Sequence, residues 1–137
     1  MTAAQDATLA LLTRYYAAFA TQDHAGMLDC LTDDVAHHIN QGGTETGKAA
    51  FAAFLDVMDT AYCERLTDMV LFASEDGTRA AAEFRVLGTY LKTAEGCPEA
   101  HGQTYELPAG AFFSLKNGKI ARISVYYNAA DWVEQVS

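Results

Sequence analysis

The chain has 137 residues, a length at which one domain can hold both a core and a pocket, so we expect residues 1–137 to form a single domain. Its 18 acidic residues outnumber its 9 basic ones, and the net charge of −9 argues against electrostatic binding to nucleic acid or to an anionic membrane surface. The N-terminal segment lacks a basic start before an apolar run, and no apolar stretch approaches the ~20 residues of a membrane span, so we expect a cytoplasmic protein.

The first half of the chain has a helical pattern interrupted by one strand. Apolar residues recur at helical spacing in each helical segment, and Asp23 is placed to cap the second one. In the alanine-rich third segment, Phe51, Phe54 or Leu55, and Met58 lie on one apolar side. The expected elements are helices over residues 6–21 and 24–31, a strand over 32–40, a turn over 41–48 and a helix over 48–62.

The second half has the pattern of strands. Apolar residues favour strands in runs that cover residues 65–74, 78–91, 104–115 and 119–128. Helices that precede a meander of antiparallel strands are typical of the α+β class. The loop over residues 92–102 is longer than a hairpin needs, and both a solvated loop and a lid over a site fit it.

Three segments carry a more specific signal. They are "TRYYAAFATQDHAGMLDCLTDDV" at residues 13–35, "GKAAFAAFL" at 47–55 and "GKIARISVYYNAADW" at 118–132. Together they resemble the SnoaL-like and ketosteroid isomerase-related branch of the NTF2-like superfamily over nearly the whole chain. The resemblance implies an α+β cone, in which a curved, mostly antiparallel sheet packs on three N-terminal helices around an apolar pocket. It also implies a homodimer formed through the outer face of the sheet.

The same resemblance implies where catalytic residues would lie. Ketosteroid isomerases use an aspartate to move a proton, and a tyrosine with a neutral carboxylic acid to hold the enolate oxygen. Position by position, the tyrosine falls on Tyr15, whereas the base falls on Ile39 and the neutral acid on Ala111. The loss of both acids argues against steroid isomerisation by that mechanism. The adjacent Tyr16 fits the apolar side of its helix as well, so the sequence leaves open which tyrosine faces the pocket.

The stretch "DDVAHHINQGG" contains two adjacent histidines. Side chains alternate between faces along a strand, so we expect His37 to point inward with Val35 and Ile39, and His38 to point outward. An imidazole with a pKa near ~6.5 exchanges protons at neutral pH, so His37 is either catalytic or a buried structural histidine. Because the pair diverges, and because the three cysteines have no close pairing, we expect no metal site and no other cofactor.

Other side chains are candidates for contact with a small-molecule ligand. Asn40 follows the strand, where it either stabilises the turn or orients a substrate oxygen. Tyr127 has the inward parity of the last strand. The remaining candidates, which would line an apolar pocket if the cone is open, are Phe54, Met58, Phe84, Tyr90 and Phe113. Aromatic and methionine side chains with this spacing also form ordinary cores.

Two functions fit these observations. The first is a cofactor-free isomerase or lyase for a small apolar substrate, with a cyclic compound as one option, in which His37 moves a proton while Tyr15 and Asn40 hold the oxygen on which charge develops. The alternative is a non-catalytic module that binds a ligand or dimerises. Water activation of the epoxide hydrolase type ranks last, because its paired aspartates and arginine have no inward positions here.

Overall fold

The computed structural model describes residues 1–137 and contains four helices and six strands. The helices are α1 (Ala3–Ala20), α2 (His24–Asp29), α3 (Lys48–Ala61) and α4 (Ala129–Val136). The strands are β1 (Leu31–His38), β2 (Thr44–Thr46), β3 (Tyr62–Ala73), β4 (Arg79–Tyr90), β5 (Thr104–Lys116) and β6 (Lys119–Tyr127). None of the helices is long and apolar enough to cross a membrane.

Local side-chain bonds explain where the first helices begin. The Thr2 hydroxyl accepts a hydrogen bond from the backbone N–H of Gln5, and the Gln5 side chain accepts one from the backbone N–H of Thr2, which forms a capping box before α1. The Asp23 carboxylate accepts from the backbone N–H of Gly26 and caps α2, as the sequence predicts.

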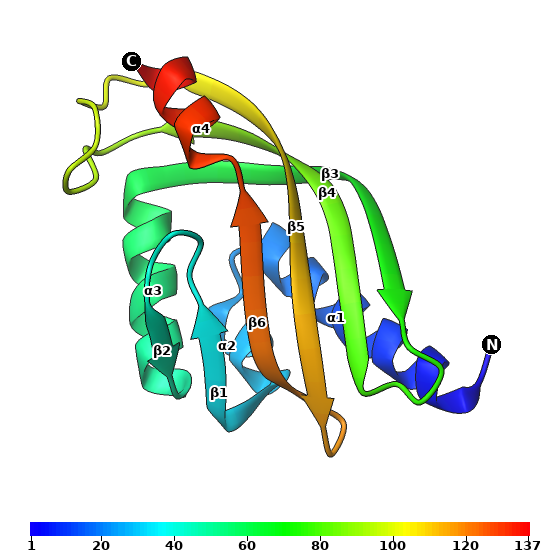
Figure 1. The fold of residues 1–137 in the computed structure, drawn as a ribbon. Helices are drawn as coiled ribbons and strands as arrows, with labels where there is room; N and C mark the ends of the chain where they lie inside the picture. Colours follow the sequence, from blue (N-terminus) through cyan, green and yellow to red (C-terminus); the bar gives the residue numbers. More distant parts are fainter.

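All strands belong to one sheet, in the order β2-β1-β6-β5-β4-β3. Strands β3 to β6 form the predicted antiparallel meander, in which Ala82 pairs with Ala111 and Phe113 pairs with Ile123. Strand β1 pairs with β6 in parallel, so that His37 lies level with Ile123. The long strands β3, β4 and β5 bend over at one end, which gives the sheet its curvature (Figure 1).

Helices α1, α2 and α3 lie on one face of this sheet, which we call the inner face, and leave the opposite, outer face open (Figure 1). Helix α1 packs against β3, and α3 packs against β1 and β3. Leu12 of α1, Met27 of α2 and Phe113 of β5 are among the largest fully buried side chains, so the core lies between the helices and the inner face. The predicted α+β class, with a curved sheet packed on three N-terminal helices, is confirmed.

The structure differs from the sequence prediction at two elements. The segment assigned to a turn contains the short edge strand β2, in which Glu45 pairs with His37. Helix α4, which the sequence prediction omits, follows β6, and its eight residues bury Trp132 and Val136. Its start is set by Asn128, whose side chain accepts from the backbone N–H of Asp131.

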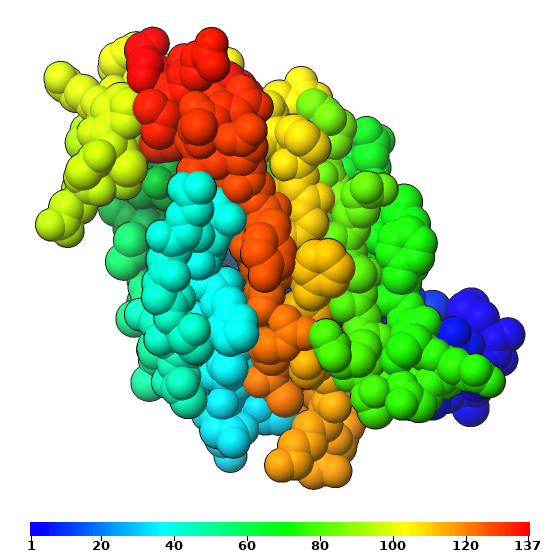
Figure 2. Space-filling view, viewed as in Figure 1, coloured from blue at the N-terminus to red at the C-terminus, as the bar shows by residue number.

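Helix α4 and the loop over residues 91–103 lie side by side at the bent end of the sheet (Figures 1 and 2). The Gln103 side chain donates to the backbone carbonyl of Val136 and so joins the loop to α4. Tyr90 is fully buried, and its hydroxyl donates to the backbone carbonyl of Pro98 within the loop. These bonds fasten the loop to α4 and to the end of β4.

Candidate functional site

His37 lies on the inner face of β1 and is 5% exposed. Its ring contacts the rings of Phe51 and Phe54 on α3, at centroid distances of 5.0 and 4.6 Å. The Nδ1 atom is buried and has no hydrogen-bond partner. Most buried polar atoms in proteins are paired, so an unpaired imidazole nitrogen is an unusual feature.

The surroundings of His37 favour the neutral imidazole. Burial lowers the pKa of His37 below its ordinary value of 6.5, the nearby carboxylate of Glu45 opposes this shift, and His38 adds to it. At neutral pH His37 is therefore present as a base that can accept a proton.

His38 points to the outer face, as strand alternation predicts. Its Nδ1 atom lies 2.9 Å from the hydroxyl oxygen of Ser124. Arg122 donates to the same hydroxyl oxygen at 2.6 Å, which leaves the hydroxyl hydrogen of Ser124 for His38. The two histidines do not converge, and no group of three or more His, Cys, Asp or Glu side chains is placed to hold a metal ion.

Both tyrosines of α1 reach the inner face. The rings of Tyr15 and Tyr16 contact the ring of Phe113 at centroid distances of 6.3 and 6.2 Å, and Tyr16 also contacts Phe84 at 5.8 Å. Burial raises the pKa of both hydroxyl groups, so both stay protonated and can donate a hydrogen bond. Tyr16 thus touches two of the predicted pocket residues and Tyr15 touches one.

Asn40 joins the end of β1 to the end of β6. Its Nδ2 atom donates to the backbone carbonyl of Tyr127 at 2.8 Å, which is the structural role that the sequence left open. Tyr127 is 39% exposed, and burial of the rest of its side chain raises the pKa of its hydroxyl group. The same amide group of Asn40 also acts on this hydroxyl and opposes the rise in its pKa.

The apolar candidates fall into two groups. Phe54 and Met58, both on α3, are partly buried. Phe84, Tyr90 and Phe113 are buried, the last two completely. A ligand reaches Tyr90 and Phe113 only if the cone opens, and contact with any member of this set stays a prediction.

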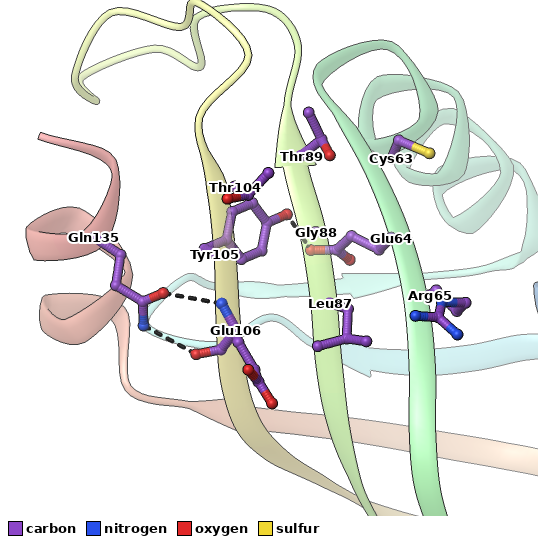
Figure 3. Close-up of a pocket in the computed structure, with 10 residues that line it drawn as sticks. All are labelled: Cys63, Glu64, Arg65, Leu87, Gly88, Thr89, Thr104, Tyr105, Glu106 and Gln135. Atoms are coloured by element: carbon purple, nitrogen blue, oxygen red, sulfur yellow. Dashed lines mark hydrogen bonds between the residues drawn. The ribbon is translucent and has the colours of Figure 1, made fainter.

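The sequence candidates omit a polar pair that the structure forms across three strands. The Tyr105 hydroxyl on β5 donates to Glu64 Oε2 on β3 at 2.5 Å. Between β5 and β3, the Tyr105 ring lies over Gly88 of β4 (Figure 3), and a Cβ atom at Gly88 would collide with this ring. Glu64 shares the alternation of Tyr62 and Leu66, and this pattern is the sequence signal that indicates its inward direction.

Two hollows lie beside the sheet. Glu64 and Tyr105 are among the residues that line a hollow of about 670 Å³ at the bent end of the sheet (Figure 3). A second hollow, of about 580 Å³, includes Phe72, Phe112 and Tyr126. Both volumes are in the range of small-molecule pockets, roughly 300–1,000 Å³.

The chain is similar to a known family and to solved structures. The model of the SnoaL-like domain matches residues 12–123. A candidate polyketide cyclase of Pseudomonas putida KT2440 is 56% identical, with a TM-score of 0.91 over 93% of this chain and 96% of that one. A candidate polyketide cyclase of Silicibacter sp. TM1040 is 53% identical, with a TM-score of 0.95 over 97% of each chain.

More distant structures share the fold. An NTF2-like protein of Burkholderia xenovorans LB400 is 18% identical, with a TM-score of 0.79 over 97% of this chain and 98% of that one. Among curated proteins, none is detectably similar to this chain. Because the domain model covers residues 12–123 and the fold agrees, the chain belongs to the SnoaL-like domain family.

Proposed function

We propose that the protein is a cofactor-free enzyme, an isomerase, a lyase or a cyclase, that acts on a small, largely apolar substrate through proton transfer by His37. The observation that carries the proposal is the buried imidazole of His37, whose Nδ1 atom has no hydrogen-bond partner. Similarity to two candidate polyketide cyclases, at 56% and 53% identity, supports a substrate with carbonyl groups.

The proposed reaction begins with neutral His37, which removes a proton from a carbon next to a carbonyl group. The electron pair of the broken C–H bond forms a C=C bond, and the π electrons of the carbonyl group move onto its oxygen, where the hydroxyl of Tyr15 donates to the enolate. The imidazolium of His37 then returns the proton to another carbon, or to the oxygen of a second carbonyl that the enolate has attacked. The apolar rings of Phe51 and Phe54 disfavour the imidazolium and so promote this return.

The carboxylate mechanism of ketosteroid isomerases is not part of this proposal. The two positions that correspond to its acids hold Ile39 and Ala111, neither of which carries a proton to transfer. We therefore expect no steroid isomerisation by that route, and the proton chemistry is assigned to His37.

A non-catalytic ligand-binding module is the second candidate, and one experiment separates the two. The protein is incubated with a bacterial metabolite extract, and mass spectrometry follows the compounds that disappear and those that stay bound. An enzyme consumes a compound and forms an isomeric or cleaved product in proportion to time. A binding module retains a compound unchanged, and that result would overturn the proposed activity.

We also propose that two copies of the chain associate through the outer face of the sheet. Phe72, Phe112 and Tyr126 are 53, 48 and 56% exposed, and they surround the hollow of about 580 Å³. Figure 2 views this outer face, on which β1, β6, β5 and β4 run side by side with no helix over them below α4. Large apolar side chains gathered on an open sheet face are typical of a protein–protein contact.

A further inference from the structure

Glu64 is a carboxyl group in surroundings that do not suit a charge. It lies on the inner face of β3 and is partly buried, and the hydrogen bond from Tyr105 is the only one that its side chain makes. None of the salt bridges includes Glu64. A carboxylate that is withdrawn from water without a cationic partner is costly, so such a group is a candidate for a functional role.

The titratable groups near Glu64 are hydroxyls, and a thiol lies near two of them. Burial is the main cause that raises the pKa of Tyr62, Tyr105 and Tyr127, and the charge of Glu64 adds to each shift. Cys97, in the loop over residues 91–103, acts on Tyr62 and Tyr127 in the same direction. These groups come from β3, β5, β6 and the loop, and no cation is among them.

One carboxyl oxygen of Glu64 accepts a hydrogen bond within the protein, and the other does not. Oε2 accepts the hydrogen bond from Tyr105, and Oε1 has no partner. Two side-chain polar atoms that lack a partner are fully buried, namely Thr32 Oγ1 and His37 Nδ1. Glu64 Oε1 also lacks a partner but is not one of these buried atoms, so solvent reaches it. Glu64 and Tyr105 both line the hollow of about 670 Å³, which has room for a small molecule.

We propose that Glu64 and Tyr105 form a binding site for an uncharged carbonyl compound, whose oxygen accepts a hydrogen bond from the protonated Glu64 carboxyl group. Because Oε2 accepts from Tyr105, the carboxyl proton resides on Oε1, the oxygen that is free to meet a ligand. An anionic ligand does not fit, because ionised Glu64 and the net charge of −9 both repel it.

The pH range of this site follows from the surroundings of Glu64. Burial raises the pKa of Glu64 above its ordinary value of 4.5, and the hydrogen bond from Tyr105 opposes the shift. The protonated, donating form therefore persists to a higher pH than for an exposed glutamate. Binding is present below this raised pKa and is lost as the pH rises through it.

The site lies further along the sheet than His37, and its proposal does not require proton transfer by His37. His37 is level with Ile123 of β6, which in turn pairs with Phe113 of β5. Tyr105 lies on β5 as well, eight residues before Phe113. At roughly 3.3 Å per residue, this separation corresponds to about 26 Å of strand.

The test uses para-fluoroacetophenone as an uncharged carbonyl probe and para-fluorobenzoate as its anionic counterpart, both followed by fluorine NMR between pH 4 and pH 8. The ketone is expected to bind at low pH, with a Kd that rises about tenfold for each pH unit above the pKa of Glu64. The benzoate is expected not to bind. Glu64→Gln, which keeps an N–H donor in place of the acid proton, should bind the ketone equally well across the whole pH range.

Four further variants complete the test. Glu64→Leu should lose ketone binding, and Gly88→Ala should weaken it with Glu64 still present, because the added methyl group displaces the Tyr105 ring. Glu106→Gln is the matched control, since Glu106 lines the same hollow but is paired with Arg85 at 2.8 Å, and it should bind like the wild type. His37→Gln should also bind like the wild type.

Four results would overturn the proposal, the first three of them directly. These three are the absence of ketone binding, a wild-type affinity that does not change with pH, and unaltered binding by Glu64→Leu. A loss of binding in His37→Gln would place the ketone near His37 instead, and would also contradict the Glu64 site. The first three results do not test whether His37 turns over a substrate, so the two proposals fail separately.

Discussion

At the scale of single residues, the environment of His37 determines what it can do. The imidazole lies against two phenylalanine rings and is 5% exposed, so adding a proton places a charge where little water is present. The carboxylate of Glu45 on the neighbouring strand opposes this effect, but burial is the larger cause and the pKa of His37 is lowered. A neutral histidine in such a place can take up a proton briefly and then return it.

The protonation of His37 can be measured directly. Because its pKa is lowered in the folded protein, we expect its ring resonances in a ¹⁵N-histidine NMR titration to change at a midpoint below 6.5. The stability that neutral His37 contributes is present above pH 6.5 and is lost as the pH falls through the lowered pKa. The His37→Gln variant assigns the resonance, and a midpoint at or above 6.5 would contradict this description.

The residue scale also shows what the sequence could predict about the site. Alternation along one strand was enough to assign His37 to the inner face and His38 to the outer face. The same alternation places Glu64 inward with Tyr62 and Leu66, so this signal was available. The hydrogen bond between Glu64 and Tyr105 was not predictable from the sequence. It depends on the register of three strands and on the absence of a side chain at Gly88.

At the scale of elements, α4 closes the bent end of the sheet with one aromatic side chain. Trp132 is 7% exposed, and its ring contacts those of Tyr62, Tyr90 and Tyr105 at centroid distances of 6.0, 5.0 and 6.1 Å. Gln135 of the same helix bonds to the backbone of Glu106 in β5, on both its N–H and its carbonyl group. The helix thus covers the strand segment that carries Tyr105.

Removal of this side chain tests the role of α4. Trp132→Ala should lower the free energy of unfolding by about 3–5 kcal/mol, because it deletes a buried aromatic ring and leaves a cavity among three tyrosines. Chemical denaturation followed by far-UV circular dichroism measures the change. Val133→Ala, on the exposed side of the same helix, should change stability by no more than ~0.5 kcal/mol. An equally small effect of Trp132→Ala would show that α4 does not hold the end of the sheet.

The sequence prediction omits β2 and α4. Helical and strand periodicity identifies α1, α3 and the meander over many positions, and the shorter α2 is indicated together with its cap at Asp23. Strand β2 has only three residues, all exposed, and its place at the sheet edge depends on pairing with β1. The parallel pairing of β1 with β6 joins segments from opposite ends of the chain, and no local pattern contains that information.

At the scale of the whole molecule, the two faces of the sheet carry different groups of side chains. The inner face and its helices enclose His37 and the Glu64–Tyr105 pair. The outer face carries Phe72, Phe112 and Tyr126, together with the bonded group of His38, Ser124 and Arg122. Stable interfaces bury roughly 800 Å² per partner, and only a broad surface such as this sheet face can supply that area.

The proposed association through the outer face predicts a dimer in solution. Phe112→Glu places a charge at the centre of the apolar group and should convert the dimer to a monomer, as measured by light scattering after size-exclusion chromatography. Val57→Glu adds the same charge to α3, at a residue that is 66% exposed, and should leave the dimer intact. A monomeric wild-type protein, or a dimer that tolerates Phe112→Glu, would place the contact elsewhere or remove it.

The most direct test of the central claim compares two adjacent histidines. Once a consumed compound is identified, turnover is measured for the wild type, His37→Gln and His38→Gln, with circular dichroism to show that each variant is folded. Loss of a general base typically lowers kcat by roughly 100- to 10,000-fold, and we expect such a decrease for His37→Gln. His38→Gln, on the opposite face of the same strand, should stay close to the wild type. Unchanged turnover in folded His37→Gln would contradict the proposed proton transfer.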